Sequence, residues 1–419
     1  MDITNWDDHI LCSGCIWLEY RIDPRYRMQI KTIADVEQQP LYFIMLRHVG
    51  YISAINKSMS EINIRLFDKG DTESFLELYE QIFNKPGKQE WFEWKYQNNP
   101  YMQHVPIYVA KDKDKVIGAR PFFALDVAWD DKTWTAIQPC DTMVHPDYRG
   151  QGIFTRMTQQ SLDFYSDQPV DLIFNFPNDK SRPGYLKMDW KEVMSIPEWY
   201  RFNDLNKPIA SESESRFLNY VSNIITNCGA IYNSLCDWTS PSPSPRIETE
   251  VTKSIPTQAL TELYEYAKPN SIHAVRNEQF YNWRFNNPQR QYKTILAKEK
   301  GTVKGAAITG MPKYNELTHA RITEILPKKN QDSNVIISIL DRIIDEYSHA
   351  DVISAFDEML TKPHRWGFIS DKRFPLSNIR QSTYLLTRPV DLGKGWYINE
   401  QKITDPDSWS ITYSEWDTS

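Results

Sequence analysis

Regularly spaced apolar residues predict an ordered series of strands and helices from residue 62 onward. Ile62, Ile64 and Leu66 alternate with polar residues, which is the period of a half-buried strand. Apolar residues then recur at helical spacing after a Lys-Gly-Asp turn. The predicted strands span 62–66, 105–110, 116–128, 133–144 and 172–176, and the predicted helices span 72–83 and 154–165. Strands and helices in this order predict an α/β fold with a mixed sheet.

The stretch from Asp141 to Tyr165 has the clearest chemical meaning. Pro146 marks a turn at the end of a strand, and Gly150 and Gly152 lie in the loop before a helix. A loop that enters a helix aims free backbone N–H groups at one point, where the helix dipole adds positive charge. Glycines also let a phosphate approach the main chain closely. We therefore expect this stretch to bind a pyrophosphate group.

The segment VHPDYRGQGI resembles the acyl-CoA loop of the GNAT N-acyltransferase superfamily, whose pattern is Gln/Arg-x-x-Gly-x-Gly/Ala. Arg149 and Gly152 match this pattern, whereas Phe154 departs from it because it replaces a small residue. The resemblance implies that acetyl-CoA is the co-substrate. The residues expected to hold it are Met143, Val144, Arg149, Gly150, Gln151, Gly152, Ile153, Phe154 and Asn178.

A second similarity to the same family follows at 178–190. Asn178, Tyr185 and Trp190 match the places of an Asn, a helical Tyr and an aromatic turn in the second family signature. Together the two similarities cover about residues 62–203, and the order of elements agrees throughout.

The resemblance also implies how acyl transfer takes place. In the family, backbone N–H groups at the end of the strand before the loop polarise the thioester carbonyl, and Tyr185 matches the acid that protonates the leaving thiol. Asp141 and His145 are candidates for the general base, and strand alternation places them on one face. Glu198 on a later strand and a water-mediated base are alternatives that the sequence leaves open.

The second half of the chain repeats the first. WFEWKYQNNP at 91–100 recurs as FYNWRFNNP at 280–288, so we expect two GNAT-like units in tandem. The second unit has KKNQDSN at 328–334 without a glycine, so it is expected to keep the fold and to have lost acyl-CoA binding. The predicted segments are an N-terminal extension of unclear role over 1–60, a GNAT domain over 61–238, a Ser/Pro linker over 239–246, a degenerate GNAT-like domain over 247–390 and a C-terminal tail over 391–419.

Composition narrows the partners and the compartment. A net charge of -7 argues against nucleic acid as the main partner. The 5 Cys include one CxxC and no second pair at metal spacing, so no metal is expected. The first residues lack the Lys and Arg of a signal peptide, and the longest apolar stretch is too short to span a bilayer. We expect a cytoplasmic protein, and a homodimer is left open.

These features predict an N-acetyltransferase that acts on a primary amine of a small molecule, with an amino sugar as one candidate acceptor. Two alternatives stay open. Aminoacyl-tRNA-dependent peptidyltransferases also have two GNAT-like units, but they do not need the glycine loop. A sensor or scaffold would hold acyl-CoA without turnover, and thiol release from acetyl-CoA over a panel of amines separates it from an enzyme.

Overall fold

The structure is a computed structural model that describes residues 62–203, 236, 238, 240–314, 317–327, 333–373, 376–378 and 382–416. The N-terminal extension predicted over 1–60 lies outside the described residues, as does 328–332 in the second loop. The conformation of that second loop therefore stays a prediction.

The first half of the described chain folds largely as its apolar pattern predicts. Its elements are β1 (Ile62–Leu66), α2 (Thr72–Phe83), α3 (Gln89–Phe92), β2 (Ile107–Asp112), β3 (Lys115–Trp129), β4 (Lys132–Pro139), β5 (Met143–Val144), α4 (Ile153–Ser166), β6 (Leu172–Asn175), α5 (Arg182–Leu186), β7 (Lys191–Ile196) and β8 (Glu198–Phe202). The strand predicted over 133–144 is broken between β4 and β5. Asp141 has a φ of 40° there, in the left-handed region, which interrupts the pleat.

The second half follows a similar order of elements, with the short strands β10 and β13 added. Its elements are β9 (Ile247–Thr252), α7 (Thr257–Tyr266), β10 (His273–Ala274), α8 (Glu278–Arg284), β11 (Tyr292–Glu299), β12 (Thr302–Gly310), β13 (Lys313–Tyr314), β14 (Leu317–Leu326), α9 (Ser333–Glu346), β15 (Val352–Phe356), β16 (Ile369–Ser370), β17 (Thr383–Pro389), β18 (Tyr397–Ile398) and β19 (Gln401–Lys402).

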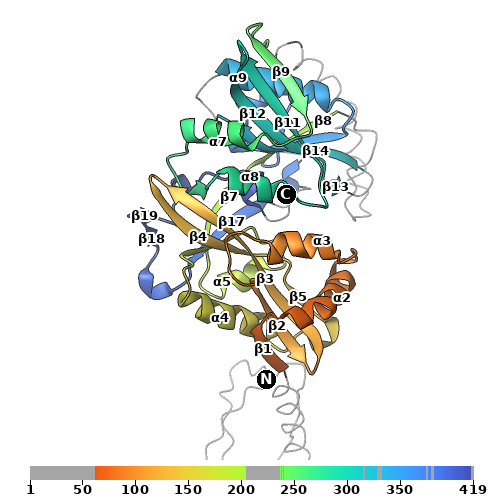
Figure 1. Ribbon diagram of the computed structural model, residues 1–419, viewed down its shortest axis with the longest axis vertical. Helices are drawn as coiled ribbons and strands as arrows, with labels where there is room; N and C mark the ends of the chain where they lie inside the picture. The colour runs from red at the N-terminus through yellow and green to blue at the C-terminus, as the bar shows by residue number, and fades with distance from the viewer. Residues whose placement is uncertain are drawn as a thin grey trace, which may run out of the picture. The chain divides into compact units, whose positions relative to one another are not determined.

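The two large sheets share one strand arrangement (Figure 1). The first runs β1-β2-β3-β4-β6-β17-β7, and the second runs β9-β11-β12-β14-β15-β8-β16. Each has a parallel pair near its centre, β4 with β6 and β14 with β15. Even a bulge recurs, since the register shifts after Ala110 in one sheet and after Ala297 in the other. The predicted mixed α/β fold with two similar units is confirmed.

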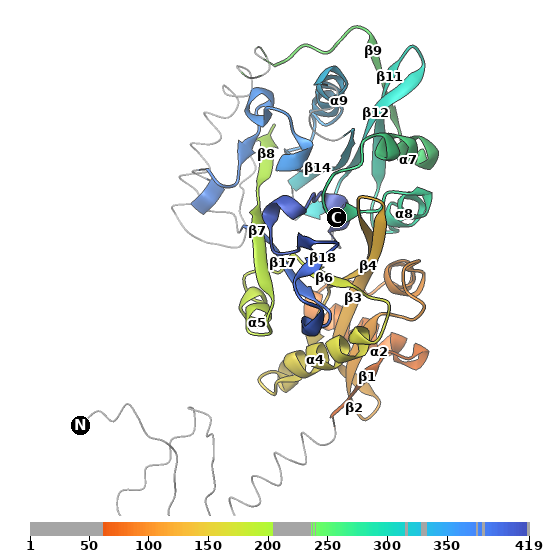
Figure 2. The ribbon, with the colours of Figure 1, turned by 90° about the vertical axis from the view of Figure 1, so that its left-hand side faces the viewer.

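The main path of each sheet contains one strand from the other half of the chain, and β10 from the second half also pairs with β3 in the first sheet. β8 follows β7 directly in the chain but pairs with β15 in the second sheet. β17 lies in the first sheet, between β6 and β7. Figure 2 shows β7 and β8 as one path that passes from the first sheet into the second. The sheets therefore do not follow the sequence segments 61–238 and 247–390, because β17 lies in the first sheet and β8 in the second.

The repeated tryptophan motifs meet at the junction of the two halves. Trp94 Nε1 donates to the Trp283 carbonyl at 2.7 Å, and Trp283 Nε1 donates to the Trp94 carbonyl at 2.9 Å. Their rings stack with centroids 5.9 Å apart. This reciprocal pair is what an approximate twofold relation between duplicated units produces, and it explains why both copies keep the motif.

Helices cover both faces of the first sheet (Figure 1). α2 and α3 pack on one face, and α4 and α5 pack on the other. α2 buries Phe75 and Leu78, and α4 buries Ile153, Met157 and Leu162. Each such side chain contributes about 1.5–3 kcal/mol when it leaves water. This packing fixes the loop between β5 and α4 in place.

The end of the described chain is built into the core. Glu415 is 1% exposed, and its carbonyl accepts a hydrogen bond from Gln138 Nε2 on β4 at 3.0 Å. Its carboxylate pairs with buried Arg276 at 2.5 Å, which also pairs with Glu324 on β14 at 2.7 Å. Part of the segment predicted as a C-terminal tail thus connects the two sheets.

Candidate active site

The loop between β5 and α4 leaves open space beside its main chain. Gly150 and Gly152 have φ of 78° and 70°, in the left-handed region that other residues rarely adopt. A Cβ atom added to either glycine would meet no described atom within 4 Å. Both glycines are exposed. A ligand can therefore approach the backbone here as closely as the sequence pattern predicts.

The N-terminus of α4 carries no side chain that competes for this space. Gly152 is the N-cap, no side chain caps the helix, and its first turn contains no acidic residue. The first N–H groups of the helix are therefore left for an anion, which the helix dipole also favours. Arg149 is exposed beside them, and its Nε donates to the Val144 carbonyl at 3.2 Å. These residues fit a pyrophosphate group.

β4 and β6 separate close to the loop. β6 pairs with β4 only at Leu172 and Ile173, but it pairs with β17 as far as Asn175. The edge of β6 that faces β4 is therefore free of sheet partners toward the carboxyl end of the strand. A gap between parallel strands at their carboxyl ends is where α/β sheets bind ligands.

The backbone of β5 aims one N–H group toward this gap. His145 N–H donates to the Ile117 carbonyl at 2.8 Å, and Val144 lies opposite Gly118 in the antiparallel pair with β3. N–H groups alternate in direction along such a strand. The N–H of Met143 therefore faces β3, whereas that of Val144 points away from β3, toward the side on which β6 diverges.

Tyr185 lies on α5 and is 3% exposed. Its phenol oxygen accepts a hydrogen bond from Arg120 Nη1 at 2.7 Å. The same nitrogen lies 2.8 Å from Thr142 Oγ1, in the break between β4 and β5. Arg120 comes from β3 and is 0% exposed. Three separate elements thus meet at Arg120 Nη1.

Phe154 occupies the space between α4 and α5. Its ring stands edge-on to the Tyr185 ring with centroids 6.0 Å apart, and the Arg120 guanidinium lies 5.2 Å from its centroid. A Cβ atom added to Gly184 would lie 3.5 Å from Phe154 Cε1. The side chain that departs from the family pattern therefore points toward α5 and not into the glycine loop.

Asp141 is engaged by two buried donors. Lys95 Nζ and the Tyr96 hydroxyl each lie 2.6 Å from its Oδ2. Burial raises the pKa of Tyr96 well above its usual value, and the Asp141 charge adds to this, so the phenol stays a donor. The Lys95 ammonium is 2% exposed, and Asp141 supplies the negative charge that it needs. These contacts hold the break between β4 and β5 in shape.

His145 is engaged at both ring nitrogens. Nδ1 accepts from the Asp147 N–H at 3.3 Å, and Nε2 lies 3.1 Å from Gln81 Nε2 on α2. Its side chain is 11% exposed. Both candidate bases, Asp141 and His145, contact the α2–α3 side of the sheet, whereas Tyr185 lies on the α4–α5 side.

Asn178 and Glu198, the two other candidates, form hydrogen bonds with nearby side chains and backbone. Asn178 is exposed, and its Oδ1 accepts from the Ser181 N–H at 3.0 Å, which shapes the turn before α5. Glu198 lies on β8 in the second sheet, where the Tyr200 and Thr383 hydroxyls donate to its carboxylate. The structure therefore places Glu198 apart from the loop residues.

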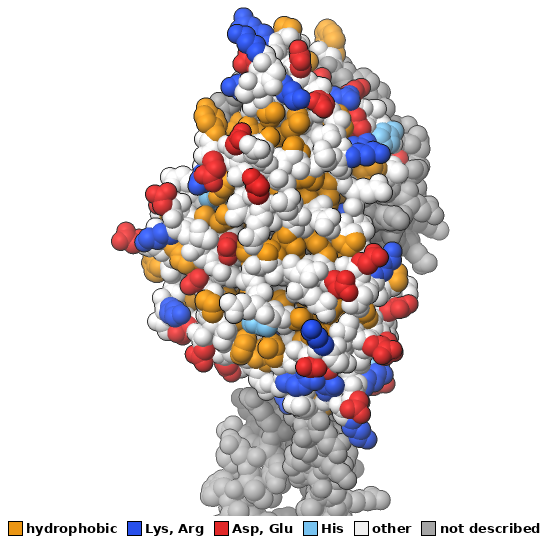
Figure 3. All heavy atoms as spheres, in the orientation of Figure 1, with side chains coloured by type: hydrophobic (Ala, Val, Ile, Leu, Met, Phe, Trp, Pro, Cys, Tyr) orange, Lys and Arg blue, Asp and Glu red, His pale blue; other side chains and the backbone are white. Residues whose placement is uncertain are grey.

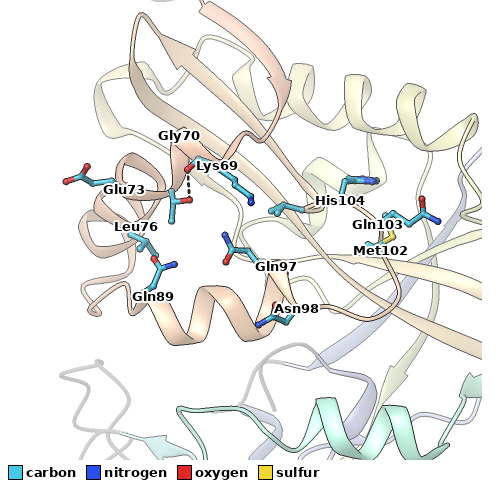
Figure 4. Close-up of a pocket in the computed structure, with 12 residues that line it drawn as sticks. Lys69, Gly70, Glu73, Leu76, Gln89, Gln97, Asn98, Met102, Gln103 and His104 are labelled. Carbon is cyan, nitrogen blue, oxygen red and sulfur yellow. Dashed lines mark hydrogen bonds between the residues drawn. The ribbon is translucent and has the colours of Figure 1, made fainter.

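A cavity of about 1060 Å³ lies near the N-terminal end of α2 (Figure 4). Lys69, Glu73 and Gln97 are among the residues that line it. Gln81, the contact of His145, lies further along α2 than Glu73, which corresponds to about 12 Å along the helix axis. This cavity is therefore separate from the glycine loop.

Basic and acidic side chains are interspersed on the face that Figure 3 shows. Within the described part of the chain, no helix is long and apolar enough to cross a membrane. In the same residues, no group of three or more His, Cys, Asp or Glu side chains is placed to hold a metal ion.

Sequence reasoning missed Arg120, Thr142 and Lys95. Arg120 had a signal, because it is the lone charge inside the apolar run VIGARPFFAL, where a central strand rarely carries one. Lys95 lies between Trp94 and Tyr96, and nothing in this local sequence indicates a pairing with Asp141. Only the folded chain brings it to Asp141.

The comparisons with known proteins agree with this geometry. Residues 63–193 match the family model described as "Acetyltransferase (GNAT) domain". No curated protein matches the chain. Among solved structures, a GCN5-related N-acetyltransferase from Anabaena variabilis is similar at 13% identity and a TM-score of 0.55, over 80% of this chain and 74% of that chain.

Two further structures are similar in fold. A conserved protein from Enterococcus faecalis, titled a probable N-acyltransferase, has 13% identity and a TM-score of 0.55, over 79% of this chain and 73% of that chain. A GCN5-related N-acetyltransferase from Kribbella flavida has 11% identity and a TM-score of 0.51, over 79% and 72%. At these identities the likeness concerns the fold.

Residues 63–193 form a GNAT acetyltransferase domain. The GNAT family uses acyl-CoA as the acyl donor.

Proposed function

We propose that the chain transfers an acetyl group from acetyl-CoA to a primary amine of a small molecule, and that its first unit carries the reaction. One observation supports this most strongly. The open glycine loop, with both glycines at positive φ, lies beside the point where β4 and β6 separate.

In this proposal the loop and the first turn of α4 hold the pyrophosphate through backbone N–H groups, and Arg149 adds positive charge. The N–H of Val144 polarises the thioester carbonyl, because it faces the gap. Tyr185 donates a proton to the sulfur as the C–S bond breaks. Each role falls to a group whose orientation suits it.

The same contacts suggest how the amine loses its proton. Asp141 is paired with Lys95, and His145 is engaged at both ring nitrogens. We therefore assign this proton to a water molecule, an alternative that the sequence leaves open. Asp141 and His145 then support the backbone around the reacting carbonyl.

The acceptor is proposed to be a small amine, with an amino sugar as one candidate. Aromatic side chains that would suit a sugar face include Trp91, Trp94 and Trp190, but these are 4%, 6% and 3% exposed and pack in the core. The acceptor must therefore be found by screening. The glycine loop favours this function over aminoacyl-tRNA-dependent transfer.

The test is thiol release from acetyl-CoA by the purified chain over a panel of amines, beside calorimetry with CoA. Release that requires an amine supports the proposal. Binding of CoA without release on any amine supports the sensor alternative. A chain that neither binds CoA nor releases thiol would overturn both.

A further inference from the structure

Arg120 carries a buried charge that the described residues do not neutralise. It is 0% exposed, and its Nε and Nη2 have no hydrogen-bond partner among the residues that the structure describes. None of the ion pairs in the described chain includes it. A buried charge without a carboxylate is costly. A buried charge that lowers the stability of the fold in this way indicates a functional role for its side chain.

Aromatic rings offset part of this cost. The guanidinium lies 5.1 Å from the Tyr185 centroid, 5.2 Å from that of Phe154 and 5.5 Å from that of Phe122. Such contacts stabilise a cation that is shielded from water. They hold the guanidinium in place and leave its remaining N–H groups unused.

The duplicated unit shows that the fold does not need an arginine here. In β3, Gly118 pairs with Ala110 and Arg120 follows two residues later. In β12, Gly305 pairs with Ala297 in the same register, so Ala307 takes the place of Arg120. Ala307 is 1% exposed in a well-packed sheet. The arginine occurs in the unit that has the glycine loop.

We propose that Arg120 is a positioning residue for acyl transfer, which acts through Tyr185. Nη1 occupies the phenol oxygen as a donor at 2.7 Å, so the phenol hydrogen must point elsewhere, toward the leaving sulfur. When Tyr185 gives up this proton, the positive guanidinium stabilises the phenolate that forms. This inference rests on the proposed function.

The step balances without another reagent. The amine nitrogen forms a bond to the thioester carbon as the C–S bond breaks, and the sulfur takes the Tyr185 proton. The nitrogen loses a proton to water, and water returns one to the phenolate. Arg120 stays charged throughout and exchanges no proton.

The experiment compares Arg120→Met, Tyr185→Phe and the double variant in the full chain. Acetyl-CoA is the donor and hydroxylamine the nucleophile, because a small strong nucleophile does not require a known acceptor. Arg120→Met should lower kcat about ten- to hundredfold, the range for a lost hydrogen bond to a charged group, and should change the KM for acetyl-CoA little.

The coupling between the two residues is the decisive measurement. The kcat of the double variant should equal that of Tyr185→Phe alone, because Arg120 acts only by positioning the Tyr185 phenol, which Tyr185→Phe removes. The melting temperature of Arg120→Met should stay equal or rise, since an unpaired buried cation has been removed.

Arg388→Met is the matched control. Arg388 is also buried in the first sheet, but its guanidinium donates to the carbonyls of Pro389 and Val390. Its replacement should leave kcat unchanged.

Three results would overturn the inference. They are additive losses in the double variant, a wild-type kcat in Arg120→Met, and an Arg120→Met chain that melts far lower or does not fold, which would make Arg120 structural. A wild-type chain without thiol release on any amine would instead overturn the proposed function, and this inference with it.

Discussion

Replacing Gly152 with Val tests the cofactor cradle directly. Gly152 has a φ of 70° and no neighbour within 4 Å of an added Cβ. The substitution therefore meets no steric clash in the free chain. Its cost to folding is that of a side chain in the left-handed region, about 1–2 kcal/mol. The melting temperature should fall by only a few degrees.

The effect on CoA affinity should be much larger. A phosphate held against Gly152 accepts hydrogen bonds from backbone N–H groups, each worth about 1.5–3 kcal/mol when one partner is charged. The valine methyl groups would fill the space of that phosphate and remove about two such bonds. The loss of about 3–6 kcal/mol corresponds to about 10²- to 10⁴-fold in Kd.

Gly301→Val provides a matched control. Gly301 lies between β11 and β12 in the second unit, has a φ of 81° and also has no neighbour within 4 Å of an added Cβ. It should show the same small loss of stability and no change in CoA affinity. The assay is calorimetry with CoA beside thermal melts without ligand. Equal CoA affinity in both variants would refute the assignment of the loop as the cradle.

The remaining predictions concern stoichiometry, the acid and pH. Calorimetry should give one CoA per chain, because 328–334 has no glycine, and a clear value of two would contradict the loss of the second site. Tyr185→Phe should lower kcat about 10²- to 10⁴-fold with little change in CoA affinity, and an unchanged kcat with chemistry rate-limiting would make Tyr185 a packing residue. Burial alone would raise the pKa of Asp71, but hydrogen bonds from Arg65 and Lys111 lower it below its usual value. Its contribution to stability is thus present above about pH 4 and is lost as the pH falls through the lowered pKa. Asp71→Asn should cost about 3 kcal/mol at pH 7, and denaturant melts should show this difference shrinking below pH 4. A constant difference from pH 7 to pH 3 would contradict the linkage.

The sequence alone determined the local elements and the glycine loop. Apolar spacing decides which face of a helix or strand is buried. Glycine decides where the backbone can adopt a positive φ at little cost in free energy. Both are short-range properties. The strand, loop and helix around Gly150 and Gly152 therefore follow from residues adjacent in the chain, as does the duplication of the tryptophan motif.

Only the tertiary structure decided which strands share a sheet. β8 and β17 each satisfy their backbone hydrogen bonds in the other half of the molecule. The unpaired N–H and C=O groups at the edge of a sheet can pair with a strand from a distant part of the chain. No local pattern encodes that choice. Domain segments drawn from the sequence therefore could not anticipate the exchange.

The same holds for the side chains around the reacting group. Asp141 and His145 are close to the loop in sequence, yet their hydrogen bonds go to Lys95 and Gln81 on other elements. Arg120 is 65 residues from Tyr185 in the chain and 2.7 Å from its hydroxyl. The sequence names the residue types that the chemistry needs. The fold decides which of them are engaged, because long-range packing sets the partner of each buried charge.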